Sequence, residues 1–339
     1  MAVTLNPTAA LVIFTMLMCG TINTVDMKAQ FDTYAMGDDE SMGVHAFRKP
    51  WFTVFGMFLS MSMGLVVHFG QQLFYRAKAS RSEGNLNHEN IENLKECLRE
   101  SSATETAVKK LGVWGTIWRC SVPALGDLSS SALGSIGLLF INASTYQMLR
   151  GASILSTAAL SSIVLKKKFT RDQYIALVIV TISLCMIAWV GSDQTSNAGA
   201  GNEQGGEDGQ KGDNTAIIGV ALVLVGQIFV AGQFVWEERV MKVIKVPPML
   251  LLGIEGVFGS LFTYFVIFPA VAQVPGNDAF GTFEDFHDSI TMLNNSSRLR
   301  LLFGGYLLSI VFFNLSSVYC TKVPTIYIFS TCFSELERF

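Results

Sequence analysis

Eight long apolar stretches divide this chain, and they constrain its fold more than any other feature. A helix needs about 20 apolar residues to cross the hydrocarbon core of a bilayer, which is about 30 Å thick. Stretches of this kind lie at 9–30, 50–75, 119–141, 143–165, 172–192, 215–241, 249–273 and 299–320. Half of the 339 residues are hydrophobic and only 15% are charged, which is too apolar for a soluble protein of this length. The sequence therefore predicts an all-α, polytopic membrane helix bundle.

The charges in the connections alternate along the chain. Connections rich in lysine and arginine lie at 76–112, 166–171 and 239–245, and acidic ones lie at 38–40, 203–213 and 278–288. Because Lys and Arg favour the cytosolic side of a membrane, we expect the N-terminus and the basic connections to be cytosolic. The acidic connections should then be lumenal or external. Two overlapping N-x-S triplets, at Asn294 and Asn295, are glycosylation candidates on that side.

The Gly-rich segment 193–214 is predicted to be a flexible lumenal linker. Five apolar stretches precede it, so the sixth runs opposite to the first, which is typical of inverted-repeat transporters. Residues 1–192 are thus predicted to form a first five-helix repeat and residues 215–339 an incomplete second repeat. The last apolar segment, 325–333, is too short to cross the bilayer. Residues 85–100 form either an amphipathic helix at the membrane interface or a solvated connector.

Arg150 lies inside the fourth apolar stretch, and a charge at a helix centre costs about 2.5–3.5 kcal/mol on insertion scales. One face of a single continuous helix would carry Tyr146, Arg150, Ser153, Thr157 and Ser161. We interpret this polar stripe, with Gln147 beside it, as the wall of a hydrated interior. The alternative is that Arg150 extends to the lumenal interface, which explains the arginine but not the hydroxyl groups.

Further polar side chains at membrane depth belong to the first, third, sixth and seventh stretches. They are Asn23, Lys28, Asp127, Gln227, Gln233, Glu237, Glu238 and Glu255. The basic groups lie toward the predicted lumenal side and the acidic groups toward the cytosolic side. Such layers suit alternating access, in which polar contacts at each end of a central site form and break. In a simpler interpretation, Lys28 is interfacial and Glu237 and Glu238 cap a helix at the interface.

Several short stretches resemble one known family. In chain order they are GTINTVDMK (20–28), KPWFTVFGMFL (49–59), PALGD (123–127), YQMLRGASI (146–154), GQIFVAGQFVWEE (226–238), GIEGVFG (253–259) and FFN (312–314). Through them the chain resembles the drug/metabolite transporter superfamily, and within it the nucleotide-sugar-transporter-like solute carrier 35 family, F branch, related to the EamA-domain proteins. The glycines of GIEGVFG also indicate close helix packing.

This resemblance implies a five-plus-five inverted repeat of ten helices around a central substrate cavity. It assigns family motif positions to Asn23, Lys28, Asp127, Gln147, Arg150, Gln227, Gln233, Glu237, Glu238 and Glu255. Asp26 does not match the family pattern. Two more spans would follow Lys322 in the family, so we expect a truncated or misspliced sequence, or a protein that lacks these two helices.

The expected function is secondary-active or exchange transport of a small polar metabolite across an endomembrane, such as that of the lysosome or Golgi. Lys28 and Arg150 favour an anionic or zwitterionic substrate, whereas the acidic layer favours a cation or proton coupling. A non-transporting membrane adaptor is the alternative function. An intramembrane enzyme is not expected, because three of the four histidines lie in connections and no H-E-x-x-H, P-loop or G-x-S-x-G motif occurs.

The scattered cysteines predict neither a disulfide framework nor a metal site, and no cofactor is expected. The partners expected are a small-molecule substrate and the lipid bilayer. Homodimerisation is left open, and nucleic acid is not an expected partner.

Overall fold

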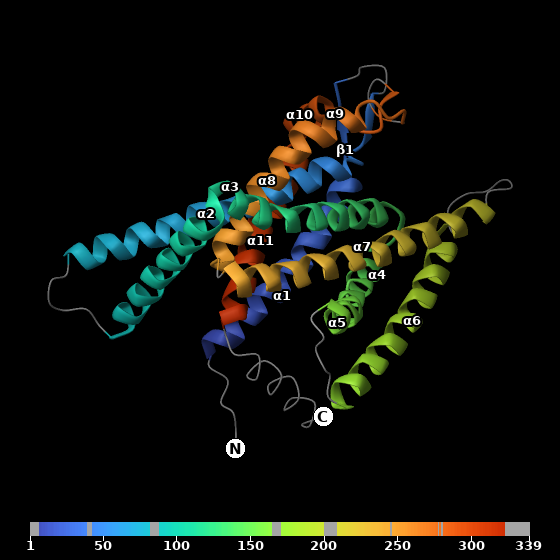
Figure 1. Ribbon diagram of the computed structural model, residues 1–339. Coiled ribbons are helices and arrows are strands. Elements are labelled where there is room, and N and C mark those ends of the chain that lie inside the picture. Colours follow the sequence, from blue (N-terminus) through green and yellow to red (C-terminus); the bar gives the residue numbers. More distant parts are fainter. Residues whose placement is uncertain are drawn as a thin grey trace.

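The computed structural model describes residues 7–38, 43–81, 88–164, 171–199, 209–244, 246–276, 278 and 281–322. Long helices pack into a bundle, and a two-stranded hairpin lies with α10 at one end of it (Figure 1). The elements in chain order are α1 (Pro7–Phe31), β1 (Tyr34–Met36), β2 (Val44–Ala46), α2 (Pro50–Arg81), α3 (His88–Phe140), α4 (Ala143–Leu149), α5 (Ala152–Val164), α6 (Arg171–Gly199), α7 (Gly209–Ile244), α8 (Pro248–Phe262), the π-helical turn η1 (Thr263–Ile267), α9 (Phe268–Val271), α10 (Phe286–Asn295) and α11 (Ser297–Lys322).

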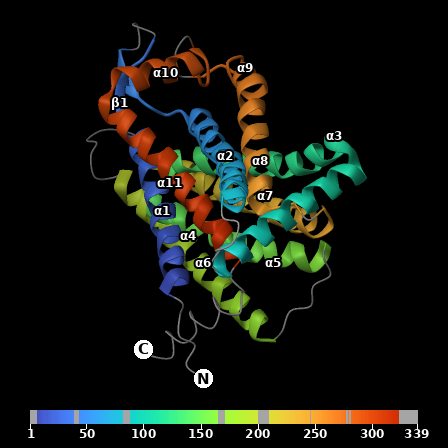
Figure 2. The ribbon, with the colours of Figure 1, turned by 90° about the vertical axis from the view of Figure 1, so that its left-hand side faces the viewer.

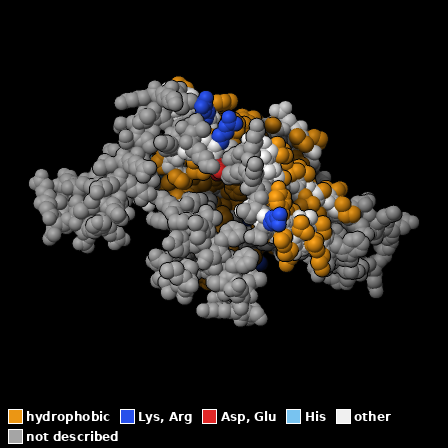
Figure 3. All heavy atoms as spheres, turned by 60° about the horizontal axis from the view of Figure 1, so that its bottom comes forward, with side chains coloured by type: hydrophobic (Ala, Val, Ile, Leu, Met, Phe, Trp, Pro, Cys, Tyr) orange, Lys and Arg blue, Asp and Glu red, His pale blue; other side chains and the backbone are white. Residues whose placement is uncertain are grey.

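Six helical segments among the described residues are long and apolar enough to cross a membrane. They are Leu11–Phe31, Pro50–Phe74, Trp114–Phe140, Ile217–Met241, Pro248–Val271 and Ser297–Val318. Hydrophobic side chains also dominate the described part of the face shown in Figure 3. The predicted all-α, polytopic membrane bundle is therefore confirmed.

The fifth predicted span falls within α6, whose apolar part Gln173–Met186 is shorter than the six segments above. Its membrane crossing stays a prediction. Helical structure reaches into both ends of the predicted linker, because α6 extends to Gly199 and α7 begins at Gly209. Residues 88–100 are helical and belong to α3, whereas 325–333 and most of the basic connection 166–171 lie outside the described residues.

The fourth predicted span is wrong as a single helix. It is divided into α4 and α5, and the chain turns at Arg150 and Gly151. Glycine has low helix propensity, about 1 kcal/mol below alanine, and the local hydrogen bonds join residues three apart instead of four. The N–H of Gly151 donates to the carbonyl of Met148, and that of Ser153 donates to the carbonyl of Arg150. The polar stripe predicted for one continuous face is consequently split between two helices.

Three pairs of helices pack side by side in both ribbon views: α1 with α11, α2 with α8, and α3 with α7 (Figures 1 and 2). Each pair joins an element of the first half of the chain to one of the second half. α3 is long and changes direction at Gly112, whose φ of 75° lies in the left-handed region that favours glycine. The kink therefore separates the membrane-spanning part of α3 from its N-terminal part.

The seam between α2 and α8 depends on glycine, as the spacing of GIEGVFG indicates. A Cβ atom on Gly256 would lie 2.3 Å from the backbone nitrogen of Ser62, and one on Gly253 would lie 2.6 Å from that of Leu65. The obstacle in each case is the α2 backbone, which cannot rotate away as a side chain could. Close approach of this kind gives helices in a bilayer the van der Waals contact that replaces hydrophobic driving force.

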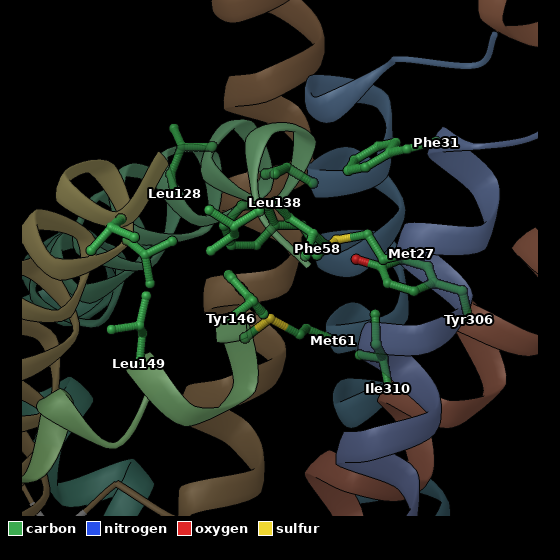
Figure 4. Close-up of a cluster of buried hydrophobic side chains, with 14 residues drawn as sticks. Met27, Phe31, Phe58, Met61, Leu128, Leu138, Tyr146, Leu149, Tyr306 and Ile310 are labelled. Carbon is green, nitrogen blue, oxygen red and sulfur yellow. The ribbon is translucent and has the colours of Figure 1, made fainter. Parts of the chain in front are cut away.

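Side chains from six helices, α1, α2, α3, α4, α7 and α11, form the main hydrophobic core. Met27 of α1, Met61 of α2, Leu138 of α3, Tyr146 of α4 and Tyr306 of α11 converge there (Figure 4). A second core lies toward the hairpin and contains mainly aromatic rings. Its buried members are Ala35, Phe47, Phe52, Phe268, Met292 and Leu299.

Gly256→Ala should destabilise the bundle by about 1–3 kcal/mol, because the added methyl group forces α2 and α8 apart. The melting temperature of the purified chain in detergent measures this loss. Gly304→Ala is the matched control, since a Cβ atom on Gly304 meets nothing within 4 Å. Equal melting temperatures for the two variants would contradict the role of the glycine seam.

Candidate functional site

A cavity of about 460 Å³ lies between the helices. Its wall receives side chains from α1, α2, α3, α4, α7, α8 and α11, so both halves of the chain contribute. Small-molecule sites in proteins typically enclose about 300–1,000 Å³ and combine apolar walls with a few polar groups. The cavity has the size of a site for one metabolite.

The structure brings eight of the predicted site residues to the cavity wall. These are Asn23, Asp127, Tyr146, Arg150, Gln227, Gln233, Glu237 and Glu255. They come from α1, α3, α4, α7, α8 and the turn after α4, which are distant in sequence and meet only in the folded bundle. Their part in handling a substrate stays a prediction.

Five predicted site residues do not line this cavity: Lys28, Gln147, Ser153, Thr157 and Glu238. Ser153 and Thr157 lie on α5, beyond the break at Gly151, so they no longer continue the face that carries Tyr146. Glu238 follows Glu237 on α7, where the next residue of a helix points about 100° away. Their expected part in a substrate cavity or a gate stays a prediction.

Lys28 and Gln147 hold helices together instead. The Nζ atom of Lys28 donates to the carbonyl oxygen of Leu138 at 3.0 Å, joining α1 to α3. The amide nitrogen of Gln147 donates to the carbonyl of Gly20 at 3.0 Å and to the hydroxyl of Thr24, joining α4 to α1. Lys28 and Gln147 are thus satisfied by partners inside the protein, as the bilayer requires.

Arg150 follows the last residue of α4, at the break. Its guanidinium carbon lies 5.9 Å from the centre of the Tyr146 ring, which is within cation–π range. It lines the cavity together with Tyr306, whose hydroxyl donates to the carbonyl of Thr53 at 3.3 Å. The helix break therefore directs the charge of Arg150 into the cavity, which explains how an arginine is accommodated inside an apolar stretch.

Three carboxyl groups line the same cavity from three different helices. Asp127 comes from α3, Glu237 from α7 and Glu255 from α8. They are close enough for the charges of Glu237 and Asp127 to act on Glu255. Asp127 accepts a hydrogen bond from the hydroxyl of Ser131 at 3.2 Å, and Glu237 shares one with Gln233.

Sequence reasoning missed several wall residues. Small hydroxyl and amide groups contribute polar surface, and methionines contribute apolar surface. They include Thr24, Ser130, Ser131, Ser135, Asn314 and Ser317, and Met16, Met27, Met57, Met61 and Met241. Serine and methionine are common in membrane helices and give no signal in the sequence. Only the folded structure shows that these residues face a cavity.

Pro123 lies on α3, one of the helices that line the cavity. It lacks an N–H group, so the carbonyl of Arg119 one turn earlier loses its usual helical partner. The indole nitrogen of Trp236 on α7 donates to that carbonyl at 3.2 Å. The bond that proline removes from α3 is replaced by a bond between α3 and α7, close to Glu237.

A separate charged cluster lies in the hairpin end of the molecule, outside the membrane-spanning segments. Lys49 is only 1% exposed and pairs with Asp278 and with Asp288, whose Oδ2 atom lies 2.7 Å from the ammonium. The backbone N–H of Asp38 donates to the other oxygen of Asp288 at 2.6 Å. These contacts tie the segment before α2 to the segment between α9 and α10.

The same cluster contains the one group of metal-ligand type found among the described residues. Single ligand atoms of His45, Asp278 and Asp288 lie within 4.8 Å of one another. The ammonium of Lys49 already contacts both carboxylates, so the positive charge is supplied by the chain itself. The pKa of Asp288 is lowered, because the bonds from Lys49 and Asp38 outweigh the effect of burial.

Glu284 caps the start of α2 from a distant part of the chain. Its two carboxyl oxygens accept the backbone N–H groups of Trp51 and Phe52 at 2.9 and 2.6 Å. These N–H groups have no partner inside the helix, and the N-terminal end of a helix favours negative charge. Burial nevertheless raises the pKa of Glu284 to about 8, against the effect of those two bonds.

Because the pKa of Glu284 is higher in the folded chain than its ordinary value, the folded state binds more protons. Stability from this group is fully present below pH about 4.5 and is lost as pH rises through about 8. Glu284→Gln keeps a hydrogen-bond acceptor but has no carboxyl group to titrate. The melting temperature of this variant should therefore fall less between pH 5 and 8 than that of the unaltered chain. Parallel curves for both proteins would refute this assignment.

A polytopic helix bundle with a polar cavity between its spans is an architecture typical of membrane transporters. The chain matches the nucleotide-sugar transporter family over residues 91–321 and belongs to that family. This is a family of transporters, so the predictions of a transporter of the solute carrier 35 type and of a non-enzyme are confirmed.

The chain is 30% identical to an uncharacterized protein of Schizosaccharomyces pombe over 210 residues, which cover 60% of this chain and 58% of that protein. It is 27% identical to solute carrier family 35 member F6 of Mus musculus over 311 residues, covering 91% of this chain and 73% of the mouse protein. It is 25% identical to the UDP-N-acetylglucosamine/UDP-N-acetylgalactosamine transporter nstp-4 of Caenorhabditis elegans, over 56% of this chain and 50% of that protein.

Proposed function

We propose that the protein moves a small polar metabolite across an endomembrane by alternating access, as a secondary-active carrier or an exchanger. The observation that carries this proposal is the cavity of about 460 Å³, in which charged and neutral polar side chains from both halves of the chain meet at membrane depth. Such groups are expensive in a bilayer and mark substrate or ion pathways.

The pairing of helices supports an inverted repeat. Suppose that α1, α2 and α3 of the first repeat correspond to α7, α8 and α11 of the second. The symmetry that relates the repeats then converts the pair α1–α11 into the pair α7–α3. It converts the pair α2–α8 into itself. These are the three pairs that pack side by side. We therefore propose residues 1–192 as the first repeat and 215–339 as an incomplete second one, separated by 193–214. Alternating access then follows from rocking of one repeat against the other.

The position of the cavity along the helices supports a closed state at the hairpin end. α11 begins at that end, and most of its lining residues, including Asn314 and Ser317, lie in the half that leads away from it. α8 begins at the opposite end, and its lining residues lie in its first half. The aromatic core and the pairs of Lys49 occupy the hairpin end. We propose that these contacts form the closed gate and open when the cavity turns to the other side.

Transport is tested by loading proteoliposomes with the purified chain and measuring uptake from a panel of labelled nucleotide sugars, amino acids and amines. At least one compound should accumulate beyond protein-free vesicles, and Arg150→Gln should change its rate by about tenfold, since the charge faces the cavity. Gly304→Ala, away from the wall, serves as the control. Flux of no compound, or an Arg150→Gln variant that transports normally, would argue against the proposal.

Membrane orientation gives a second test. With a cytosolic N-terminus, α10 and the hairpin face the lumen, where glycans are attached. Asn294 and Asn295 are both exposed, but the amide nitrogen of Asn295 donates to the carbonyl of Met36 at 2.9 Å. We therefore expect a glycan on Asn294, removed by Asn294→Gln and retained in Asn295→Gln. The measurement is the gel mobility of the expressed chain before and after glycosidase, and no shift in either would contradict the proposed orientation.

A further inference from the structure

The charges on the cavity wall do not balance. Asp127, Glu237 and Glu255 provide three carboxyl groups, whereas Arg150 is the single Lys or Arg among the described wall residues. Lys28, the other basic group expected near a substrate, points instead to the carbonyl of Leu138. The described wall is thus predominantly acidic.

Glu255 has an unused acceptor. Its side chain is only 2% exposed, lines the cavity, and has one carboxyl oxygen, Oε1, with no hydrogen-bond partner. Buried carboxyl oxygens are normally paired, because an unsatisfied one costs about 1–3 kcal/mol or more. Asp127 and Glu237 each have a neutral partner, Ser131 and Gln233, and neither partner supplies positive charge.

No lysine or arginine in the described part of the chain forms an ion pair with Glu255. Like charges meet at this end of the cavity, since Glu237 and Asp127 both act on Glu255. In an environment of low dielectric constant such a group is stabilised by a positive charge placed between its members. The charge of Arg150 reaches Asp127, and Glu255 has no such partner among the Lys and Arg residues of the described wall.

A nucleoside diphosphate sugar is poorly suited to this end of the cavity. Its pyrophosphate carries two negative charges, and it would meet three carboxyl groups with one guanidinium to offset them. An organic cation has the opposite charge and fits the unused acceptor. The rest of the wall suits its carbon substituents, because Tyr146, Phe234 and Phe313 offer aromatic faces and the methionines offer polarizable, adaptable surface.

We propose that the acidic end of the cavity, formed by Asp127, Glu237 and Glu255, binds the cationic nitrogen of an amine or quaternary ammonium metabolite. This inference rests on the proposed transport function, because it assigns the substrate class of the same cavity. Arg150 lies at the α4 side of that cavity and accommodates a polar or singly anionic group of the same molecule, so a zwitterion also fits.

Binding to the purified full chain in detergent, measured by calorimetry, tests the proposal without requiring transport. The probes are tyramine, choline and agmatine as cations, 4-ethylphenol as the neutral counterpart of tyramine, and UDP-N-acetylglucosamine as the dianion. At least one amine should bind, and Glu255→Gln should weaken it about tenfold or more, as expected when one member of a buried charge pair is removed. The affinity for 4-ethylphenol should be unchanged by Glu255→Gln.

Two further variants should change the amine affinity in opposite directions, which a general folding defect would not do. Glu237→Gln should weaken the amine in the same direction as Glu255→Gln, whereas Arg150→Gln should strengthen it about threefold, because one repelling charge is lost. Glu238→Gln is the matched control, since Glu238 neighbours Glu237 and does not line the cavity.

Three results would overturn the proposal: binding of none of the amines, amine binding that is equal in the unaltered chain and in both glutamate variants, or binding of UDP-N-acetylglucosamine in preference to every amine. The last result would leave the transport function intact and reverse only the substrate class. Conversely, amine binding that depends on Glu255, combined with no flux in proteoliposomes, would retain the site and refute transport.

Discussion

A bilayer offers no water to the polar groups inside it, and this constraint organises the whole structure. Each polar group at membrane depth must find a partner in the protein or face a hydrated cavity. Lys28 finds the carbonyl of Leu138, and Gln147 finds Thr24 and Gly20. The carbonyl freed by Pro123 finds the indole of Trp236. The side-chain amide of Gln30 and one carboxyl oxygen of Glu255 have no such partner, and of these two residues Glu255 lines the cavity.

The same constraint explains how much could be predicted from the sequence. Apolar length and the alternation of charge predict where helices cross, and six of the eight predicted spans have the length and hydropathy required. The position of charges inside apolar stretches identified all four charged residues of the described wall, since a charge in a span needs a physical reason to be there. Periodicity could not show that the fourth span breaks at Gly151, because the apolar composition continues through the break.

The hairpin end was beyond sequence reasoning for a different reason. Lys49 and Asp288 are 239 residues apart in the sequence. In the sequence, the acidic segment 278–288 that pairs with Lys49 looks like an ordinary solvated connection. Only the folded bundle brings them together, with Glu284 reaching the start of α2. The sequence also could not show that Lys28 and Gln147 contact neighbouring helices instead of the cavity. Helical spacing predicts which residues share one face of a helix, but not which neighbouring helix packs against that face.

Two interruptions of helical geometry lie next to single residues that disfavour a regular helix. Gly151 divides the fourth span beside Arg150, and Pro269, which cannot donate a backbone bond, follows the π-helical turn Thr263–Ile267 in the span of Glu255. Each interruption lies between part of the cavity wall and part of the span that does not contact the cavity. Hinge motions concentrate at a few such positions, where the backbone is not held by a regular ladder of hydrogen bonds. Arg150 and Glu255 are therefore carried on spans with an interrupted helical hydrogen-bond ladder, while the tight glycine seam holds α2 and α8 together.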